Sequence, residues 1–301
     1  MADRNRYRYG SRVEMILNEG IVLGFEEDVT LLVGQERALR VRETRKPTGG
    51  NRSLRRYEVS LEAFQRASEA EHLGERLALA LLWSAISIKY SARLVYSGEM
   101  PYRVYDRALG GGLQMYADGY VARVTTPTVL AEVLEDFLNT DIAMVPELQT
   151  SMELFTAARM ETSDRAKFVG LVSAVEPLAK QQKYKGVVKD LTKVFQQQLD
   201  EAEGIDDTVR ESLRGRIADL RRESVRLAIR RLFDQHMPNN APAWEAIDEA
   251  YGARSKMLHE GETYEDLAHR SLVIEDVLRL LYSRILGKAL ISRPGLAPGV
   301  A

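Results

Sequence analysis

The spacing of hydrophobic residues changes once along this chain, and that change constrains the fold more than any single motif. Over the first 60 residues, apolar and polar residues alternate in short runs, which is the period of a β-strand. After Thr126-Pro127, apolar residues recur every three to four positions, which is the period of an amphipathic helix. The sequence therefore predicts a sheet-containing N-terminal part followed by a helical part.

Short apolar runs separated by turn residues predict the first strands. Glycines and the cluster from Pro47 to Asn51 punctuate these runs as turns do. The predicted strands are Val13–Leu17, Ile21–Phe25, Val29–Val33, Leu39–Val41 and Arg56–Leu61. We expect them to form one small, strongly connected sheet.

A helix and further strands complete this part. From Ala67 to Tyr90, apolar residues recur at intervals of three and four, which predicts a helix that packs on the sheet. Arg93–Tyr96 is predicted as a strand, and Asp118-Gly119 predicts a hairpin turn within Gln114–Val124. Residues 1–125 are thus predicted to form an α+β domain with a small sheet and one long helix.

The rest of the chain is predicted to be helical. Thr126 supplies an N-cap oxygen, and Pro127 suits the first helical position because its missing N–H costs nothing there. Gly204 before the capping box Thr208-x-x-Glu211, and the segment 238–242 with two prolines, separate later helices. These helices are predicted at about 145–160, 164–182, 186–203, 208–236, 242–259 and 263–287. We expect residues 126–290 to form an antiparallel helical bundle and residues 291–301 a flexible tail.

Composition excludes several kinds of chemistry. The 301 residues, 45% hydrophobic and 29% charged, are typical of a globular protein large enough for two domains. Because cysteine is absent, disulfides, a thiolate nucleophile and cysteine-ligated metals are excluded. The four histidines, His72, His236, His259 and His269, are at least ten residues apart, so none forms the short-spaced pair of a helical zinc site. We expect neither a metal nor a cofactor.

Charge and hydropathy also limit the partners. The net charge of −2 means that any anionic partner must be bound by local basic patches. The longest nearly apolar run, Leu77–Ile88, is far shorter than the roughly 20 residues that span a bilayer. The N-terminus lacks the apolar stretch of a secretory signal. We expect a cytoplasmic protein with no membrane contact.

The search for catalytic motifs leaves histidine with arginine. Phosphate-binding glycine loops and the Gly-x-Ser-x-Gly elbow are absent from the sequence. Arg254 and His259, five residues apart, suit metal-free RNA cleavage: histidine moves protons near neutral pH, and arginine stabilises charge on phosphate oxygens. Five helical residues rotate by about 500°, so the two side chains lie roughly 140° apart unless the helix ends between them. Gly261 marks an expected helix end that would free the histidine to turn.

The same spacing occurs a second time, so the bare pattern is weak evidence. Arg231 and His236 are also five residues apart, at the end of a basic helix. A histidine in a last helical turn is already explained by its favourable interaction with the helix dipole. We therefore expect His236 to be structural. We also expect structural roles for His72 and His269, which have apolar neighbours.

The residues around His259 distinguish its Arg–His motif from the one at His236. The run Tyr251-Gly-Ala-Arg254-Ser255-Lys-Met-Leu-His259-Glu-Gly261 resembles the signature helix of the HEPN superfamily, particularly of Apea-like HEPN domains. Phe168–Leu178 is similar to the acidic helix that opens the bundle in that family. Upstream, Gly74–Ile88 with Arg93-Leu94 and Val104–Arg107 is similar to the N-terminal region often attached to it. The resemblance covers most of the chain loosely, and residues 251–261 are its most specific part.

The resemblance implies a helical bundle that forms a homodimer, in which two Arg–His motifs face each other in one composite site. Many HEPN proteins are metal-independent endoribonucleases of toxin and phage-defence systems. Carried onto this chain, His259 is the acid–base residue and Arg254 the phosphate clamp. Ser255 departs from the Asn, Asp or His that is common in toxin branches, although serine can still bind phosphate or orient the histidine. Glu176 either orients one of these two residues or is an exposed or capping carboxylate.

Two other interpretations stay open. The chain is alternatively a catalytically inactive HEPN dimer that acts as an RNA- or protein-binding module, or an unrelated helical regulator in which the motif occurs by chance. Supporting roles in the first interpretation fall to Ser255, Glu176 and Tyr251.

Two basic clusters are candidates for RNA binding. Residues 36–56 contain eight basic residues and two glutamates, and a second cluster lies on the helix from Arg221 to Arg231. Such side chains can track a phosphate backbone without reading sequence. The alternative is a solvated hairpin and a solvated helix face. The candidates are Arg52, Arg55, Arg56, Arg226, Arg230 and Arg231.

Overall fold

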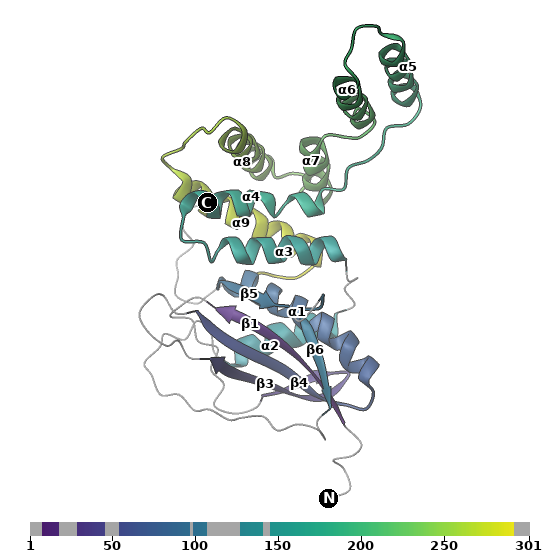
Figure 1. Ribbon diagram of the computed structural model, residues 1–301. Helices are drawn as coiled ribbons and strands as arrows, with labels where there is room; N and C mark the ends of the chain where they lie inside the picture. The colour runs from purple at the N-terminus through teal and green to yellow at the C-terminus, as the bar shows by residue number, and fades with distance from the viewer. Residues whose placement is uncertain are drawn as a thin grey trace, which may run out of the picture. The chain divides into compact units, whose positions relative to one another are not determined.

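The computed structural model describes residues 8–17, 29–45, 54–96, 99–106, 127–140 and 145–291. An antiparallel sheet region comes first, and a helical region follows it (Figure 1). Contacts divide the chain into two compact units: Met1–Ala174 with Tyr264–Ala301, and Val175–Thr263. The predicted domain boundary at 125, the strand 21–25, the hairpin 114–124 and all but the first residue of the tail 291–301 lie outside the described residues.

The first unit contains the sheet. Its strands run in the order β2-β3-β4-β1-β5, and β6 also pairs with β1. All pairings are antiparallel. The strands are β1 (Tyr9–Leu17), β2 (Val29–Val33), β3 (Gln35–Arg45), β4 (Arg55–Phe64), β5 (Ala92–Val95) and β6 (Tyr102–Asp106). One edge of β1 is thus shared: β5 pairs with its C-terminal half and β6 with its N-terminal half.

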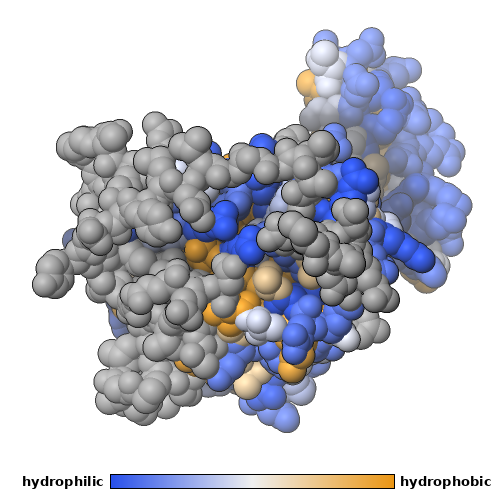
Figure 2. All heavy atoms as spheres, turned by 90° about the horizontal axis from the view of Figure 1, so that it is seen from below, coloured by the Kyte–Doolittle hydropathy of each residue, from blue (hydrophilic) through white to orange (hydrophobic). Residues whose placement is uncertain are grey.

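Strand register gives the sheet one apolar and one polar face. Val41, Val59 and Val13 lie opposite one another on β3, β4 and β1, and all three are buried. The intervening residues on these strands, such as Arg12 and Glu58, point to the other face because side chains alternate. In the view of Figure 2, most of the described surface is hydrophilic, and the hydrophobic residues gather near the middle.

Helix α1 (Ala67–Ile88) is the centre of the first unit. It contacts β1, β4, β5 and β6 as well as two later helices, and 14 of its 22 residues are buried. Figure 1 shows α1 and α2 behind the strands. The other helices of this unit are α2 (Pro127–Asn139), α3 (Pro146–Ala158), α4 (Asp164–Ser173) and α9 (Leu267–Leu286).

Two arginines donate hydrogen bonds to the backbone carbonyls at the C-terminal end of α1. Nε of Arg279 donates to the carbonyl of Ile86 at 2.8 Å, and Nη2 of Arg279 donates to Ser87 at 3.1 Å. Arg159 donates to the carbonyls of Lys89 and Tyr90 just beyond the helix. The last four carbonyls of a helix have no partner within it, and cations favour that end. These contacts bind α3 and α9 to α1.

The second unit is helical. It holds the 3-10 helix η1 (Glu176–Leu178), α5 (Val187–Glu201), α6 (Asp207–Asp219), α7 (Val225–His236) and α8 (Ala241–His259). Helix α5 packs on α6, and α7 packs on both η1 and α8. Side chains of Asp206, Ser224 and Asn240 accept backbone N–H bonds at the starts of α6, α7 and α8.

Two predicted helices are shorter in the structure. The prediction of one helix over 164–182 is wrong, because α4 ends at Ser173. Pro177 explains this end, since its ring clashes with the carbonyl four residues earlier, which is that of Ser173. The prediction of one helix over 208–236 is also wrong. Residues 220–224 leave the helix, and Lys183 pairs with Arg222 in an antiparallel bridge.

Local details differ from the prediction at three further places. The α6 N-cap is Asp206 rather than the predicted Thr208. Strand β3 is much longer than Leu39–Val41, because its mostly polar flanking residues pair with β2 and β4. Strand β6 was not predicted, because its sequence Tyr-Arg-Val-Tyr-Asp has no clear apolar face of its own. The predicted strand Arg93–Tyr96 and helix Ala67–Tyr90 are confirmed within two residues.

The contact between α1 and the sheet yields a test. A Cβ atom on Gly74 would lie 2.3 Å from Oγ of Ser11 and 2.6 Å from the Tyr102 ring. Gly74→Ala should therefore lower the free energy of unfolding by about 1–3 kcal/mol, although alanine is the better helix former. Gly215→Ala on α6, where no atom lies within 4 Å, should instead stabilise by about 1 kcal/mol. Urea unfolding of both variants measures this, and stabilisation by Gly74→Ala would contradict the packing.

Candidate functional site

Helix α8 carries the Arg–His motif. The helix begins after Asn240, whose side chain accepts from the N–H of Ala243 at 3.1 Å, and Pro242 occupies its first turn. It buries one stripe, formed by Ala243, Ile247, Ala250, Ala253 and Met257. The motif residues flank this stripe, so the buried face fixes where they point.

Arg254 forms an ion pair with Glu176. Nη1 of Arg254 lies 2.6 Å from Oε1 of Glu176, and the two side chains are 19% and 32% exposed. Nε of Arg254 is buried and donates to no acceptor among the described residues. Glu176 therefore contacts the motif through Arg254 rather than His259, while its side chain remains partly exposed.

Tyr251 lies beside this pair. Burial raises the pKa of Tyr251, the negative charge of Glu176 raises it further, and Arg254 opposes both effects. Its hydroxyl is therefore a neutral donor at physiological pH. Tyr251, Arg254 and Glu176 together form a cluster between α8 and η1.

His259 is separate from this cluster. Helix α8 continues through His259, and the N–H of Glu260 still bonds to the carbonyl of Lys256 at 2.8 Å. The expectation that the helix end frees the histidine is wrong, because Gly261, with φ of 72°, comes after the last helical turn. Arg254 and His259 therefore lie roughly 140° apart around one helix. His259 is exposed and has no hydrogen-bond partner among the described residues.

The surface around His259 is open. Ser255 is exposed, and a Cβ atom on Gly252 would meet nothing within 4 Å. Leu258 is 51% exposed next to His259. Gly252, Ser255 and His259 follow one another at helical spacing, so they share one uncovered line along α8.

The second Arg–His pair has a different environment. His236 lies in the last turn of α7, as predicted, but burial lowers its pKa. Burial disfavours the charged form of the imidazole, which is opposite to the effect expected from the helix dipole. Arg231 is already bound, since Nη2 of Arg231 lies 2.9 Å from Glu223 and 2.6 Å from the carbonyl of Lys180.

The remaining basic candidates of α7 are also engaged. Arg226 forms a two-pronged ion pair with Asp248. Arg230 lies 5.2 Å above the ring of Trp244 and 3.9 Å from Asp234. The side chains of both arginines are more than half exposed, so they can contact a phosphate if they release these partners.

The N-terminal basic candidates do not form one patch. Arg52 lies outside the described residues. Arg55 and Arg56 are adjacent on β4, so their side chains point to opposite faces of the sheet. Arg55 lies 3.4 Å from Glu43, and Arg56 lies 3.6 Å from Glu14.

His72 and His269 were expected to be structural, yet both side chains are exposed on their helices. Among the described residues, no cluster of three or more potential metal ligands occurs. Within the same residues, no helix has both the length and the hydropathy that a bilayer span requires.

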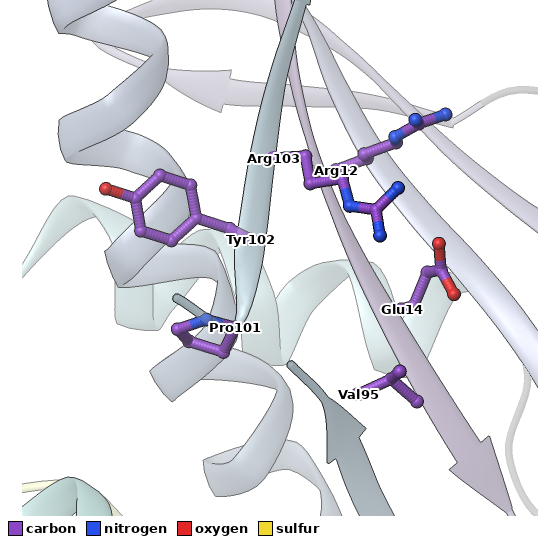
Figure 3. A pocket seen from close by; sticks show the side chains of 6 residues that line it. All are labelled: Arg12, Glu14, Val95, Pro101, Tyr102 and Arg103. Atoms are coloured by element: carbon purple, nitrogen blue, oxygen red, sulfur yellow. The ribbon is translucent and has the colours of Figure 1, made fainter. Parts of the chain in front are cut away.

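Sequence reasoning missed a depression on the polar face of the sheet. It lies where β5 ends and β6 begins, and Figure 3 shows Arg12, Arg103 and Glu14 on one side of β6, with Tyr102 on the other. The residues that line it are Arg12, Glu14, Val95, Pro101, Tyr102 and Arg103. The signal available in the sequence was arginine at alternate strand positions, which only the register brings together.

Comparison with protein-family models, with curated proteins and with solved structures finds no match to this chain. The function of the chain is therefore inferred from its site residues and from the resemblance of residues 251–261.

The lowered pKa of His236 predicts a pH dependence of stability. The unfolded chain binds a proton near pH 6.5, whereas the folded chain binds it only at lower pH. The free energy of unfolding should therefore fall as the pH drops below about 6.5. His236→Gln should make this fall shallower, measured by urea unfolding at several pH values, and His259→Gln is the exposed control. An unchanged slope in His236→Gln would contradict the assignment.

Proposed function

We propose that this protein is a metal-independent endoribonuclease of HEPN type that cleaves RNA at a composite site of a homodimer, in a cytoplasmic defence or stress response. The observation that carries the proposal is the arrangement on α8. This helix holds Arg254 at 2.6 Å from Glu176 and presents His259 to solvent five residues later. The surrounding residues 251–261 resemble the HEPN signature.

The chemistry needs no metal. The 2′-hydroxyl of a ribose loses its proton to a base and attacks the phosphorus, while the bond to the 5′-oxygen breaks and that oxygen takes a proton from an acid. The products are a 2′,3′-cyclic phosphate and a 5′-hydroxyl. His259 of one copy takes the proton and, once protonated, gives it to the departing 5′-oxygen, and Arg254 of the other copy stabilises the charge on the phosphate oxygens.

A second copy is needed because one chain does not bring the two residues together. Arg254 and His259 lie on different sides of α8, so His259 of one copy must meet Arg254 of another. Two-fold symmetry creates two such pairs at once. The open surface at Gly252 and Ser255 and the exposed Leu258 suit close approach of another helix.

Helix α5 also favours self-association of the second unit. Val187, Leu191 and Val194 form an exposed apolar stripe at helical spacing, with exposed fractions of 82%, 48% and 48%. Residues 183–193 carry four lysines and one aspartate, and residues 200–207 carry five acidic residues and no basic ones. An antiparallel pair of α5 helices therefore places opposite charges together.

A specific observation also favours the alternative, an inactive HEPN dimer that binds RNA or protein. Glu176 already neutralises Arg254, and a serine stands after that arginine. A phosphate must then compete with a carboxylate for the clamp. In this case the Arg–His motif stabilises the dimer or binds RNA without cutting it.

Cleavage of structured RNA in EDTA tests the proposal. Wild-type protein should cut and leave 2′,3′-cyclic phosphate ends, and His259→Ala should lose at least about 100-fold in rate because proton transfer contributes that much or more. His236→Ala is the matched control and should keep the wild-type rate. A folded dimer that does not cut would support the inactive module.

Mixing two inactive variants tests the composite site. In a mixed dimer of Arg254→Ala and His259→Ala, one Arg–His pair across the interface is complete and the other lacks both residues. The mixture should regain about one quarter of the wild-type rate, since half of the dimers are mixed and each has one of two pairs. No recovery in a mixture shown to exchange subunits would contradict the trans arrangement.

A further inference from the structure

The polar face of the sheet is rich in arginine. Strand register and alternation place six arginines and four glutamates on this face, which we call the outer face. The arginines are Arg12, Arg40, Arg42, Arg56, Arg93 and Arg103, and the glutamates are Glu14, Glu36, Glu58 and Glu62. Among the described helices, those that contact the sheet, α1, α2 and α3, leave this face uncovered, since the buried apolar residues of β1, β3 and β4 lie on the opposite side.

Ion pairs account for half of these arginines. Arg12 lies 3.0 Å from Glu58, Arg40 lies 2.8 Å from Glu62, and Arg56 lies 3.6 Å from Glu14. The other three, Arg42, Arg93 and Arg103, are exposed and have no ion-pair partner among the described residues. The outer face therefore retains unneutralised positive charge.

The register also places like charges directly opposite each other. Arg12 on β1 lies directly opposite Arg103 on β6. On its other side Arg12 lies opposite Ser60 on β4, and Ser60 in turn lies opposite Arg40 on β3. Directly opposed like charges destabilise a sheet. Three arginines thus stand in one row across four strands, which spans roughly 14 Å because neighbouring strands lie about 4.8 Å apart. An anionic ligand would relieve this repulsion.

Packing against Tyr105 holds part of the row in place. The Tyr105 ring lies across Gly10, where a Cβ atom would be 2.5 Å from the ring, and its hydroxyl donates to Glu62 at 2.9 Å. Burial raises the pKa of Tyr105, so this donor stays protonated. The Arg12 guanidinium lies 5.7 Å from the same ring, and Nε of Arg12 is buried without an acceptor among the described residues.

The depression in Figure 3 lies at the end of this row. Arg12, Arg103 and Glu14 point to the same side of the sheet there, while Tyr102 packs against α1 at Gly74. The depression is shallow, and the arginines extend well beyond it across β1, β4 and β3. One small anion would contact only part of the row, whereas a chain of phosphates contacts all of it.

We propose that the outer face binds the sugar-phosphate backbone of a nucleic-acid strand through the row Arg40, Arg12 and Arg103, with Arg42 and Arg93 as flanking contacts. A stacked strand offers one phosphate about every 3.4 Å along its axis, so several phosphates face a row of this span. Because these contacts go to phosphates, the surface binds different base sequences with similar affinity. This inference goes beyond the proposed nuclease site and does not depend on its activity.

The experiment uses the full chain with His259→Ala, so that no probe is cut. Labelled single-stranded poly(U), poly(A) and poly(dT) are titrated by fluorescence anisotropy in EDTA, between about 50 and 200 mM salt. The test variant combines Arg42→Ala, Arg93→Ala and Arg103→Ala, which breaks no ion pair between described residues. The matched control combines Arg66→Ala, Arg216→Ala and Arg284→Ala, three exposed cations outside the sheet and outside the other sites and interfaces proposed above.

The test variant should bind all three probes at least about tenfold more weakly, and the slope of log affinity against log salt should fall by about 2, since each lost phosphate contact removes about 0.7. The control should bind as the parent does. Unchanged binding of the test variant, an equal loss in the control, or no binding by the parent at low salt would each overturn the proposal. Binding without cleavage by the wild-type chain would contradict the nuclease and leave this inference standing.

Discussion

The first unit depends on the hydrogen bonds that satisfy the backbone carbonyls at the C-terminal end of α1. This helix is buried along most of its length, so its terminal carbonyls have little access to water. Arg279 from α9 and Arg159 from α3 donate to the carbonyls of Ile86, Ser87, Lys89 and Tyr90. Glu275 lies 3.2 Å from Arg159 and balances its charge. The same contacts that satisfy α1 bind helices from the far end of the chain to the sheet layer.

With α1 fixed on one face, the register of the sheet determines the chemistry of the other. Each buried valine of β1 and β4 forces its neighbours outward, because side chains alternate. The arginines and glutamates of the outer face are therefore placed by the apolar pattern of the core. A slip by one residue would bury them and expose the valines, so the row of Arg12 and Arg103 is as strongly specified as the core itself.

The second unit presents its candidate residues from one helix. The buried stripe of α8 directs Arg254 toward Glu176 on η1, and the continuous helix carries His259 about 140° away. Pro177 ends α4 at Ser173 and leaves Glu176 in a 3-10 turn that faces the arginine. Arg254 and His259 therefore face different sides of α8, which is why the proposed nuclease site needs a second copy of the chain.

The sequence by itself determined the strand and helix periods, the long helix from Ala67 and the motif residues Arg254 and His259, because these depend on local spacing. Tertiary structure decided the contacts between segments that lie far apart in the sequence. Residues 220–224 left the helical pattern because Arg222 pairs with Lys183, 39 positions earlier, and β6 formed because β1 offered an unpaired edge. The partner of Arg254 and the row of outer arginines arose from residues brought together across the fold. Such contacts are set by packing and register between distant segments, which no single stretch of sequence contains.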